Sequence, residues 1–347
     1  MTAPEKAVFD VLHAGLQTTV QDLGRPGYLA DGIPPSGAFD SAALKLANLL
    51  VGNPVGDHVL VGTDPGAAGL EMLLVGPRLR ARTCTVVAVT GADLQPTLDG
   101  RPIPLWTSVV VRPGQEITFG GARSGARGYL AVAGGLAVTP VLGSRATNVR
   151  AGLGGVDGRA LRAGDVLSAY PKHGPVVALA GRRLRPELRP PMSGGPDDPA
   201  VLRVVLGPQD DLFTPDSVRT FLTARWRLSA TSDRMGCRFI GPALHFLPRP
   251  AHLVEQAGAD PSNIVDDAIC IGSIQVPSGL EPIVMGVDGP SLGGYAKIAT
   301  VISADLPVLA QLTPGGLATF LAITPDDAHT VHLAARAAGA ADSVERL

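Results

Sequence analysis

The sequence contains only three cysteines, Cys84, Cys237 and Cys270, and they lie far apart. No pair has the C-x-x-C spacing of a metal or redox site, and an odd number of cysteines does not favour a disulfide framework. The histidines are scattered as well, and none belongs to the H-E-x-x-H zinc motif. The sequence therefore predicts no metal site, and we interpret the cysteines as small buried hydrophobic side chains.

Excess charge and aromatic side chains are scarce. The 29 Lys+Arg and 31 Asp+Glu residues nearly cancel to a formal net charge of -2, and 4% of the residues are aromatic. Nucleic-acid-binding proteins typically present a basic surface, often with aromatic rings on which bases stack. The composition therefore argues against a nucleic-acid partner.

Long hydrophobic runs are absent. The two longest uncharged stretches, residues 128–144 and 306–325, are interrupted by glycine and proline, which is not typical of a membrane-spanning helix. The N-terminal residues, MTAPEKAVFD, lack the apolar region of a signal peptide. We therefore expect no membrane association and a cytoplasmic location.

Short apolar runs separated by glycine and proline dominate the chain. Five of them have the length and the β-branched content of strands: residues 85–89, 108–111, 129–132, 201–206 and 298–302. A glycine turn followed by alternating residues recurs at 112–119, 162–169 and 312–320. This recurring pattern is typical of hairpins and barrel corners.

Helical patterns are fewer. Residues 40–51 have an apolar face, with Asp40 placed to cap the start and Gly52 placed to end the helix. Residues 214–226 begin Thr-Pro-Asp, a cap followed by proline at the first helical position. Residues 325–346 are alanine-rich and also predict a helix. The balance predicts a mainly β fold with a few helices.

One segment has the composition of a linker. Residues 181–199 (GRRLRPELRPPMSGGPDDP) are rich in Arg, Pro and Gly and show no periodicity. The segment divides the chain into an N-terminal β-rich lobe over residues 1–185 and a C-terminal β-rich lobe over residues 200–347 that ends in a helix. Both lobes are near the usual size of a domain.

Neither a G-x-x-x-x-G-K-[ST] phosphate loop nor a G-x-S-x-G nucleophile elbow is present. Residues 15–27 (GLQTTVQDLGRPG) instead resemble the opening motif of the biotin-dependent carboxyltransferase-like family, which includes allophanate hydrolase subunit 2, the Kip antagonist and the C-type subunit of 5-oxoprolinase. The resemblance continues in order through residues 32–40 (GIPPSGAFD), 46–53, 90–92, 129–136 (YLAVAGGL), 141–147 (VLGSRAT), 152–165, 205–209 (VLGPQ), 232–236 (SDRMG) and 293–306 (GGYAKIATVISADL).

The resemblance implies a fold of cyclophilin-like β-barrel subdomains. It also implies an enzyme role, as the C-type subunit of an ATP-dependent 5-oxoprolinase-type complex that hydrolyses the lactam of 5-oxoproline to glutamate. The sequence does not locate the ATP, and we expect a partner subunit to share its site. The implied partners are a B-type subunit similar to allophanate hydrolase subunit 1, an A-type lactam-utilisation subunit, and a small-molecule lactam or amide.

Two alternatives remain open. Residues 261–264 (PSNI) and 288–294 (DGPSLGG) resemble the carboxyltransferase domain of urea carboxylase, which would move a carboxyl group from carboxybiotin carried on another chain. A third interpretation is a regulator similar to the Kip antagonist, which would bind a partner protein without chemistry. By contrast, Lys297 in GYAKIA and the SDRMG segment match the 5-oxoprolinase branch.

Three cations are candidate catalytic residues, because phosphoryl chemistry depends on positioned charge. Arg25 lies in the glycine-flanked turn DLGRPG, Arg145 lies in GSRAT, and Lys297 begins an apolar strand. Each has a structural alternative. Arg25 would be a surface residue of a tight turn, Arg145 would form a salt bridge, and Lys297 would protect an exposed edge strand.

Five further residues are candidates for substrate binding. Ser36 and Asp40 precede the first predicted helix, whose free N–H groups favour an anion; Asp40 would also cap that helix. Ser232, Asp233 and Arg234 lie in the SDRMG segment, where the adjacent opposite charges would otherwise form a solvated turn.

Overall fold

The computed structural model describes residues 5–56, 64–172, 174–190, 192–249, 251–338 and 343–346. The chain forms two compact units. Unit 1 comprises Met1–Gly27, Pro35–Met192 and Ala338–Leu347, and unit 2 comprises Tyr28–Pro34 and Ser193–Ala337. The boundary at Met192 lies inside the segment predicted as a linker. Two assignments differ from the predicted lobes, because Tyr28–Pro34 belongs to unit 2 and the C-terminal residues belong to unit 1.

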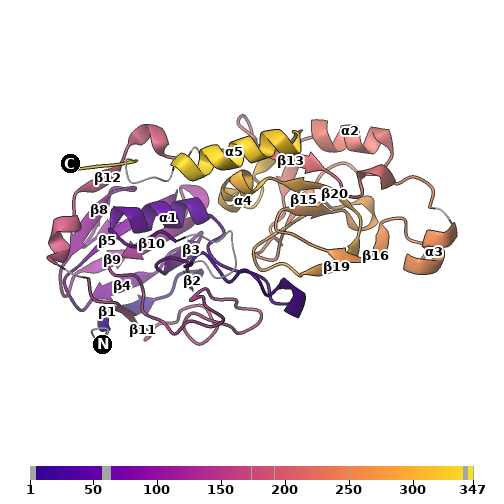
Figure 1. Cartoon of the computed structure of the whole chain (residues 1–347). Coiled ribbons are helices and arrows are strands. Elements are labelled where there is room, and N and C mark those ends of the chain that lie inside the picture. The colour runs from indigo at the N-terminus through magenta and orange to yellow at the C-terminus, as the bar shows by residue number, and fades with distance from the viewer. Residues whose placement is uncertain are drawn as a thin grey trace. The chain divides into compact units, whose positions relative to one another are not determined.

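Unit 1 is built on two antiparallel sheets (Figure 1). The six-stranded sheet has the order β11 (Val166–Ala169), β1 (Lys6–His13), β4 (Arg78–Ala81), β9 (Glu116–Thr118), β6 (Thr97–Leu98) and β7 (Arg101–Pro102). The five-stranded sheet has the order β2 (Gln17–Gln21), β3 (Gly69–Leu73), β10 (Ser124–Val132), β5 (Thr85–Asp93) and β8 (Ser108–Val111).

Strand β5 is buried on both faces, which explains why its sequence, TVVAV, is apolar without alternation. Val87 and Val89 join the core cluster that also contains side chains of the six-stranded sheet, such as Phe9. Val86 and Ala88 point the other way, into a cluster with Ala47 and Leu50 of helix α1 (Ser41–Leu50). The helix therefore covers one face of the five-stranded sheet, and the six-stranded sheet packs on the other.

Unit 2 is a closed barrel of seven strands. Their order is β13 (Ala200–Leu206), β20 (Lys297–Val301), β17 (Ser273–Gln275), β18 (Ile283–Met285), β15 (Gly236–Ile240), β14 (Trp226–Leu228) and β21 (Leu317–Ala322). Strands β16 (Asn263–Ala268) and β19 (Leu292–Tyr295) form a separate two-stranded antiparallel sheet. Helices α2 (Pro215–Thr223), α3 (Ala251–Ala257), α4 (Leu306–Gln311) and α5 (Pro325–Ala338) complete the unit.

Aromatic side chains fill one part of unit 2. The rings of Phe221 and Phe320 stack with centroids 4.5 Å apart, and Phe239 meets Phe320 edge to face at 5.6 Å. Trp226 is fully buried beside them, and its Nε1 donates to the carbonyl of Phe221 at 3.0 Å. Several of the chain's few aromatic residues therefore lie in this core and not on the surface.

The predicted fold class, mainly β with barrel subdomains and few helices, is confirmed. All five predicted strands are present, and Asp40 and Thr214 cap α1 and α2 as expected. Three expectations were wrong. The helix predicted over 214–226 ends at Thr223, and the one predicted over 325–346 ends at Ala338, with Val344–Arg346 forming strand β22 instead. Cys84 and Cys270 are exposed, whereas Cys237 is buried.

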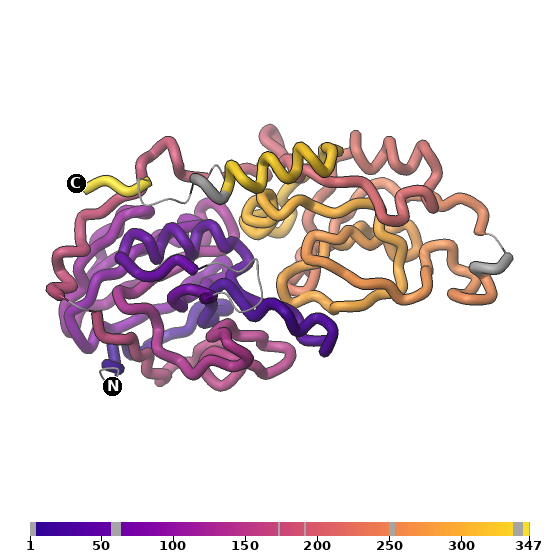
Figure 2. Tube along the Cα trace, viewed as in Figure 1, coloured from indigo at the N-terminus to yellow at the C-terminus, as the bar shows by residue number. Residues whose placement is uncertain are grey.

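The C-terminal strand explains why the chain end belongs to unit 1. Strand β22 pairs antiparallel with β12 (Arg182–Leu184), which lies inside the segment predicted as a linker (Figure 2). Because backbone pairing of this kind connects residues far apart in sequence, composition alone does not reveal it.

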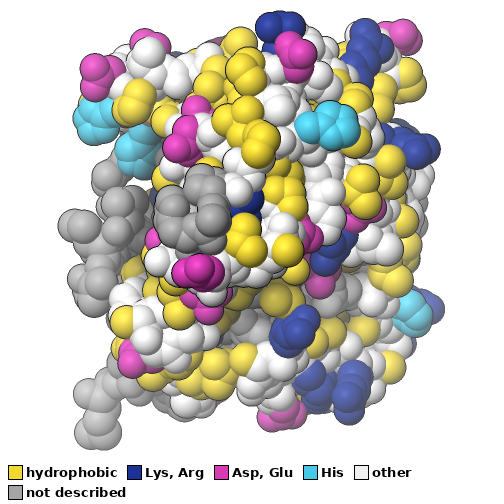
Figure 3. All heavy atoms as spheres, turned by 90° about the vertical axis from the view of Figure 1, so that its right-hand side faces the viewer, with side chains coloured by type: hydrophobic (Ala, Val, Ile, Leu, Met, Phe, Trp, Pro, Cys, Tyr) yellow, Lys and Arg dark blue, Asp and Glu magenta, His cyan; other side chains and the backbone are white. Residues whose placement is uncertain are grey.

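Among the described residues, no helix has the length and apolar character that a membrane span requires. On the face drawn in Figure 3, hydrophobic side chains are dispersed among polar ones, and basic and acidic side chains are interspersed.

Candidate functional site

Two motif loops of unit 1 pack backbone against backbone. The amide of Arg25 donates to the carbonyl of Pro35 at 2.7 Å, and the amide of Ala38 donates to the carbonyl of Asp22 at 2.8 Å. A Cβ at Gly37 would lie 2.6 Å from the carbonyl carbon of Leu23. Gly24 of DLGRPG and Gly37 of SGAFD are therefore required by the close approach of the two loops.

Arg25 is buried, with 1% of its surface exposed. Its guanidinium donates to the carbonyl of Ala146, and its Nε donates to that of Val141 at 3.3 Å. These contacts join the DLGRPG loop to the VLGSRAT loop. The surface alternative for Arg25 is therefore wrong.

A buried carboxylate organises the same loops. Asp22 is fully buried and accepts hydrogen bonds from the Ser144 hydroxyl at 2.6 Å, the Gly24 amide at 2.8 Å and the Arg145 amide at 2.6 Å. Burial raises the pKa of Asp22 above its usual value, and the three donors act in the opposite direction. Neither Asp22 nor Ser144 was predicted from the sequence as a site residue, although both lie inside the motifs.

The side chain of Arg145 lies over the ring of Tyr170, with its guanidinium carbon 5.3 Å from the ring centroid. Both line a cavity of about 160 Å³, here called the Arg145 cavity, together with Asp64, Gly134 and Gly135. The Nε of Arg145 is buried and has no hydrogen-bond partner among the described residues. Arg145 is thus placed to meet an anionic or carbonyl group in this cavity.

The side chains of Ser36 and Asp40 each accept a hydrogen bond from a residue elsewhere in unit 1. Ser36 has a left-handed backbone (φ 56), and its hydroxyl accepts from Asn148 at 3.2 Å. Asp40 caps α1 by accepting from the Ala43 amide at 2.8 Å. Both residues are buried, at 4% and 2% exposure. The capping role of Asp40 is confirmed.

A buried polar network fixes the backbone of the segment from Ser36 to Asp40. The hydroxyl of Tyr129 donates to Glu71 at 2.8 Å and accepts from the Asp40 amide at 2.8 Å. Glu71 also accepts from the Phe39 amide at 2.9 Å, and Arg127 lies 3.8 Å from its carboxylate. Burial raises the pKa of Tyr129 well above its usual value, so its hydroxyl remains a donor.

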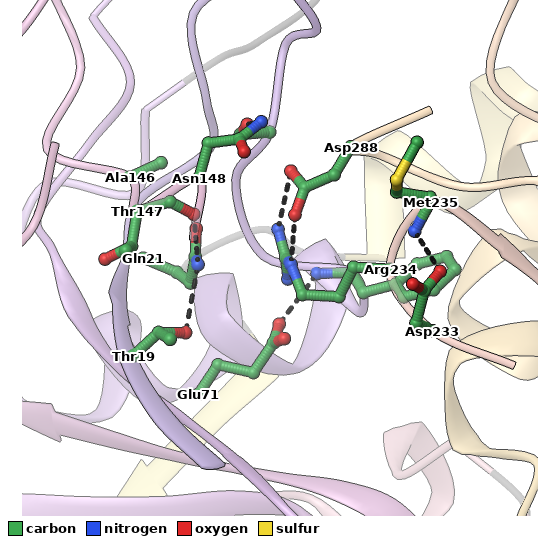
Figure 4. A network of polar contacts seen from close by, with 12 residues as sticks. Thr19, Gln21, Glu71, Ala146, Thr147, Asn148, Asp233, Arg234, Met235 and Asp288 are labelled. Atoms are coloured by element: carbon green, nitrogen blue, oxygen red, sulfur yellow. Dashed lines mark hydrogen bonds and ion pairs between the residues drawn. The ribbon is translucent and has the colours of Figure 1, made fainter. Parts of the chain in front are cut away.

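Gln21 occupies a second buried polar position in unit 1. Its Nε2 donates to the Thr19 hydroxyl and to the Thr147 carbonyl, both at 3.0 Å (Figure 4). Its Oε1 is buried without a partner among the described residues. Because buried acceptors are usually satisfied, this oxygen marks a place where a small donor such as water would be stabilised.

In unit 2, the SDRMG segment forms a turn whose arginine is buried. The Arg234 Nε donates to Asp288 at 2.7 Å, and Nη2 reaches the other carboxylate oxygen at 3.3 Å (Figure 4). Asp233 accepts from the amides of Met235 and Gly236. Ser232 bridges the turn by accepting from the Arg238 amide at 3.0 Å. The alternative of a solvated turn is therefore wrong for Arg234.

Lys297 is also buried, with 1% exposure. Its strand, β20, lies between β13 and β17 inside the barrel, so the edge-strand alternative is wrong. The Nζ donates to Asp267 Oδ2 at 2.6 Å and to the Ala268 carbonyl at 3.2 Å. Lys297 and its neighbours lower the pKa of Asp267 below its usual value. Asp267, on β16, was not singled out from the sequence.

Two motifs meet at one cavity beside this pair. Gln209 of VLGPQ accepts from the Lys297 amide at 3.1 Å and donates to Asp267 at 3.2 Å. Gln209, Asp267, and Pro261, Asn263 and Ile264 of PSNI line a cavity of about 330 Å³, here called the β16 cavity. Apolar walls with a few polar groups are typical of small-molecule sites.

The predicted site residues therefore fall into two groups. Arg25, Arg145, Ser36 and Asp40 lie in unit 1, where Asp22 and Ser144 connect two of the loops. Lys297 and the residues of SDRMG lie in unit 2. Glu71, Tyr129 and Asp267 were missed, because a single carboxylate or phenol in a strand carries no local signal of its partner.

The family model described as "Carboxyltransferase domain, subdomain A and B" matches residues 31–322, and the chain belongs to this family. The resemblance inferred from the motifs is thereby confirmed.

The similar proteins are of two kinds, urea amidolyase or urea carboxylase on the one hand and a 5-oxoprolinase subunit on the other. The chain is 35% identical to a urea amidolyase of Lachancea kluyveri, over 91% of this chain and 17% of that protein. It is 32% identical to the C-type subunit of 5-oxoprolinase from Haemophilus influenzae, over 92% of this chain and 93% of that protein. The solved urea carboxylase of Kluyveromyces lactis superimposes with a TM-score of 0.87 at 32% identity, over 99% of this chain and 30% of that one.

The chain spans less than a fifth of the urea amidolyase and nearly the whole of the 5-oxoprolinase component. These relatives are enzymes or enzyme components, and the family is common to both descriptions.

Proposed function

We propose that this chain acts as the C-type subunit of a complex that hydrolyses the lactam of 5-oxoproline to glutamate with ATP. The observation that carries the proposal is the match to a 5-oxoprolinase component of the same type over 93% of that relative's length. The net reaction adds water across the lactam C–N bond, and hydrolysis of ATP drives it. The A-type and B-type subunits would supply the remainder of the machinery.

The chain's own residues favour a role in binding and orienting the small amide. The Arg145 cavity and the β16 cavity each combine polar side chains with room for a small ring. A positioned reactant lowers the barrier because its orientation is fixed before the reaction. Arg145 would stabilise negative charge that develops on an oxygen, and the Lys297–Asp267 pair would order the wall of the β16 cavity.

Neither cavity by itself fits a nucleoside triphosphate. Among the described residues, each has a single arginine as its cationic lining residue, Arg145 in one and Arg249 in the other, and each also contains an aspartate. A triphosphate requires several donors or cations around its phosphates. We therefore assign no step on these residues to ATP, and we expect the partner subunit to provide its contacts.

Reconstitution tests the proposal. The chain is co-expressed with a B-type and an A-type subunit, and glutamate release from 5-oxoproline is measured with and without ATP. ATP-dependent release that disappears when this chain is omitted supports the proposal. A stable complex that releases no glutamate under these conditions overturns it.

The second candidate function is transfer of a carboxyl group from carboxybiotin to urea or a similar amide. It is favoured by the position of Pro261, Asn263 and Ile264, since this urea-carboxylase-like segment lines the β16 cavity. The biotin would be carried on another protein. ATP-dependent carboxylation of urea by the chain with a biotin carboxylase partner, in the absence of glutamate release, would establish this function instead.

A further inference from the structure

Among the described residues that line the β16 cavity, one has a carboxylate, Asp267. Almost half of this side chain, 46%, is exposed, whereas the side chain of Lys297 that donates to it is 2% exposed. Because the ammonium is enclosed, a molecule in the cavity meets the aspartate and not the lysine.

Three donors already reach the carboxylate from the protein. Oδ2 accepts from Lys297 Nζ at 2.6 Å and from Gln209 Nε2 at 3.2 Å, and Oδ1 accepts from the Ala268 amide at 2.8 Å. An ionised carboxylate offers about four acceptor positions. One position therefore remains, and it belongs to the exposed part of the side chain.

The charges around Asp267 define what would fill that position. Lys297 on β20 compensates the carboxylate, Arg249 contributes a positive charge to the same cavity lining, and β19, which pairs with β16, has no charged residue. A neutral or singly charged ligand is therefore favoured over a polycation. Apolar side chains such as Leu212, Leu247 and Ile264 line the remainder and favour ring methylene groups.

Arg249 adds a requirement for an acceptor on the ligand. Its Nη1 donates to the Asp260 carbonyl at 2.5 Å, and its Nε is buried without a hydrogen-bond partner among the described residues. An unpaired buried donor is unfavourable, so a small shift of this side chain toward a ligand oxygen would be stabilising.

We infer that the β16 cavity binds a cyclic amide through its N–H group, with Asp267 as the acceptor and with Lys297 and Gln209 as positioning residues. The inference rests on the proposed function and identifies the part of the substrate that this chain recognises. The shared chemistry is a ring N–H beside a carbonyl. It occurs both in a lactam such as 5-oxoproline and in a cyclic urea.

The first experiment uses the wild-type full chain and therefore needs no variant to fold. Pyrrolidinone and N-methylpyrrolidinone are titrated into isotope-labelled protein, and binding is followed by NMR at the residues of β16. Loss of a hydrogen bond to a charged acceptor predicts roughly tenfold or weaker binding of the methylated ring. Equal affinity of the two rings, or shifts confined to residues outside the cavity, would overturn the inference.

A pair of neighbouring variants tests the acceptor. Asp267→Asn removes the charge and is expected to weaken pyrrolidinone binding about tenfold. Asp266→Asn is the matched control, because Asp266 is exposed and is absent from the cavity lining; it should leave binding unchanged. If both variants bind as the wild type does, Asp267 is not the acceptor.

The positioning role of Lys297 is tested by a pH profile. The Lys297 ammonium holds the pKa of Asp267 below its usual value, so wild-type affinity should stay level as the pH falls to about 4.5. In Lys297→Met the pKa of Asp267 rises, and affinity should begin to fall at a higher pH. A merely structural lysine would leave the shape of the profile unchanged and would lower only the stability.

Two further ring compounds distinguish the two possible kinds of ligand, a lactam and a cyclic urea. Preferential binding of 5-oxoproline over imidazolidinone indicates a lactam substrate, and the reverse preference indicates a cyclic urea. Either preference supports recognition of the N–H group if methylation of the ring nitrogen abolishes binding. Glutamate release by the reconstituted complex is measured separately. The proposed function can therefore fail while N–H recognition stands, or hold while N–H recognition fails.

Discussion

The hydroxyl of Tyr129 and the carboxylate of Glu71 lie 2.8 Å apart, joining two adjacent strands of the five-stranded sheet at a point where both side chains are buried. The same hydroxyl accepts from the Asp40 amide, and the same carboxylate accepts from the Phe39 amide. The SGAFD loop is therefore fixed by side chains of β3 and β10, and not by its own sequence alone.

We expect Tyr129→Phe to lower the free energy of unfolding by about 1–3 kcal/mol, because it removes two buried hydrogen bonds, one to Glu71 and one from the Asp40 amide. Urea unfolding measures the change. Tyr170→Phe is the matched control. Tyr170 is exposed, and among the described residues its hydroxyl has only a long contact, 3.4 Å, from Arg145, so its loss should change stability by less than about 0.5 kcal/mol. Equal effects of the two variants would contradict the role of the network.

Gly37→Ala should destabilise the protein by about 2–4 kcal/mol, because it combines a left-handed backbone with a steric clash. Gly37 has φ 87, and the added Cβ would lie 2.6 Å from the backbone of Leu23. At Gly100 the backbone is also left-handed (φ 78), but nothing lies within 4 Å. Gly100→Ala should therefore cost only about 1 kcal/mol. The free energies of unfolding of the two variants, measured by chemical denaturation, separate the cost of the steric clash from the cost of a side chain on a left-handed backbone.

Asp165 makes stability depend on pH. Arg159 donates to both of its carboxylate oxygens, at 2.8 and 2.9 Å, and lowers its pKa below the usual value. Because the pKa of this carboxyl is lower in the folded than in the unfolded protein, its ionised form stabilises the fold. This stabilisation is fully present at pH values above the pKa in the unfolded protein, about 3.9, and is lost as the pH falls through the pKa in the folded protein.

Asp165→Asn should therefore lower the free energy of unfolding near neutral pH, by about 0.5–1 kcal/mol. The difference from the wild type should disappear as the pH approaches about 2. Urea unfolding over a series of pH values gives the free energy of unfolding of the wild type and of the variant as a function of pH. Asp157→Asn serves as the control, since this carboxylate is 79% exposed and lies 3.3 Å from the same arginine. A constant difference at every pH would rule out the ionic contribution.

Lys297→Met should reduce ATP-dependent turnover of the reconstituted complex roughly ten- to hundredfold, because a displaced Asp267 no longer orients the substrate. Since Lys297 is buried, the melting temperature should fall as well, and Lys297→Ala should lower it further by leaving a cavity. Lys6→Met, at an exposed position, should change neither. A lower melting temperature with full turnover would assign Lys297 a structural role alone.

Local patterns in the sequence predicted most of the regular structure. The β-branched runs became β5, β8, β10, β13 and β20, and Asp40 and Thr214 cap their helices as their positions indicated. By contrast, the ends of two helices were misplaced. Residues 344–346 form a strand because β12 offers backbone partners, which no local alanine-rich pattern records.

The candidate site was predicted less well. The ordered motifs identified the family and the loops, but not the partners of the charged residues. Arg25 was expected in a turn and is buried against two backbone carbonyls. Lys297 was placed correctly in a strand, yet its burial and its pairing with Asp267 depend on closure of the barrel.

The sequence by itself determined the strands, the capped helices, the glycine turns and the family, because each of these depends on residue type and spacing over a few positions. Tertiary structure alone decided which charges meet. Tyr129 and Glu71 are 58 positions apart, and Lys297 and Asp267 are 30 apart. Pairing over such separations is set by sheet register and barrel closure, and burial of Tyr129, Glu71 and Lys297 strengthens these contacts, because water competes less for buried polar groups.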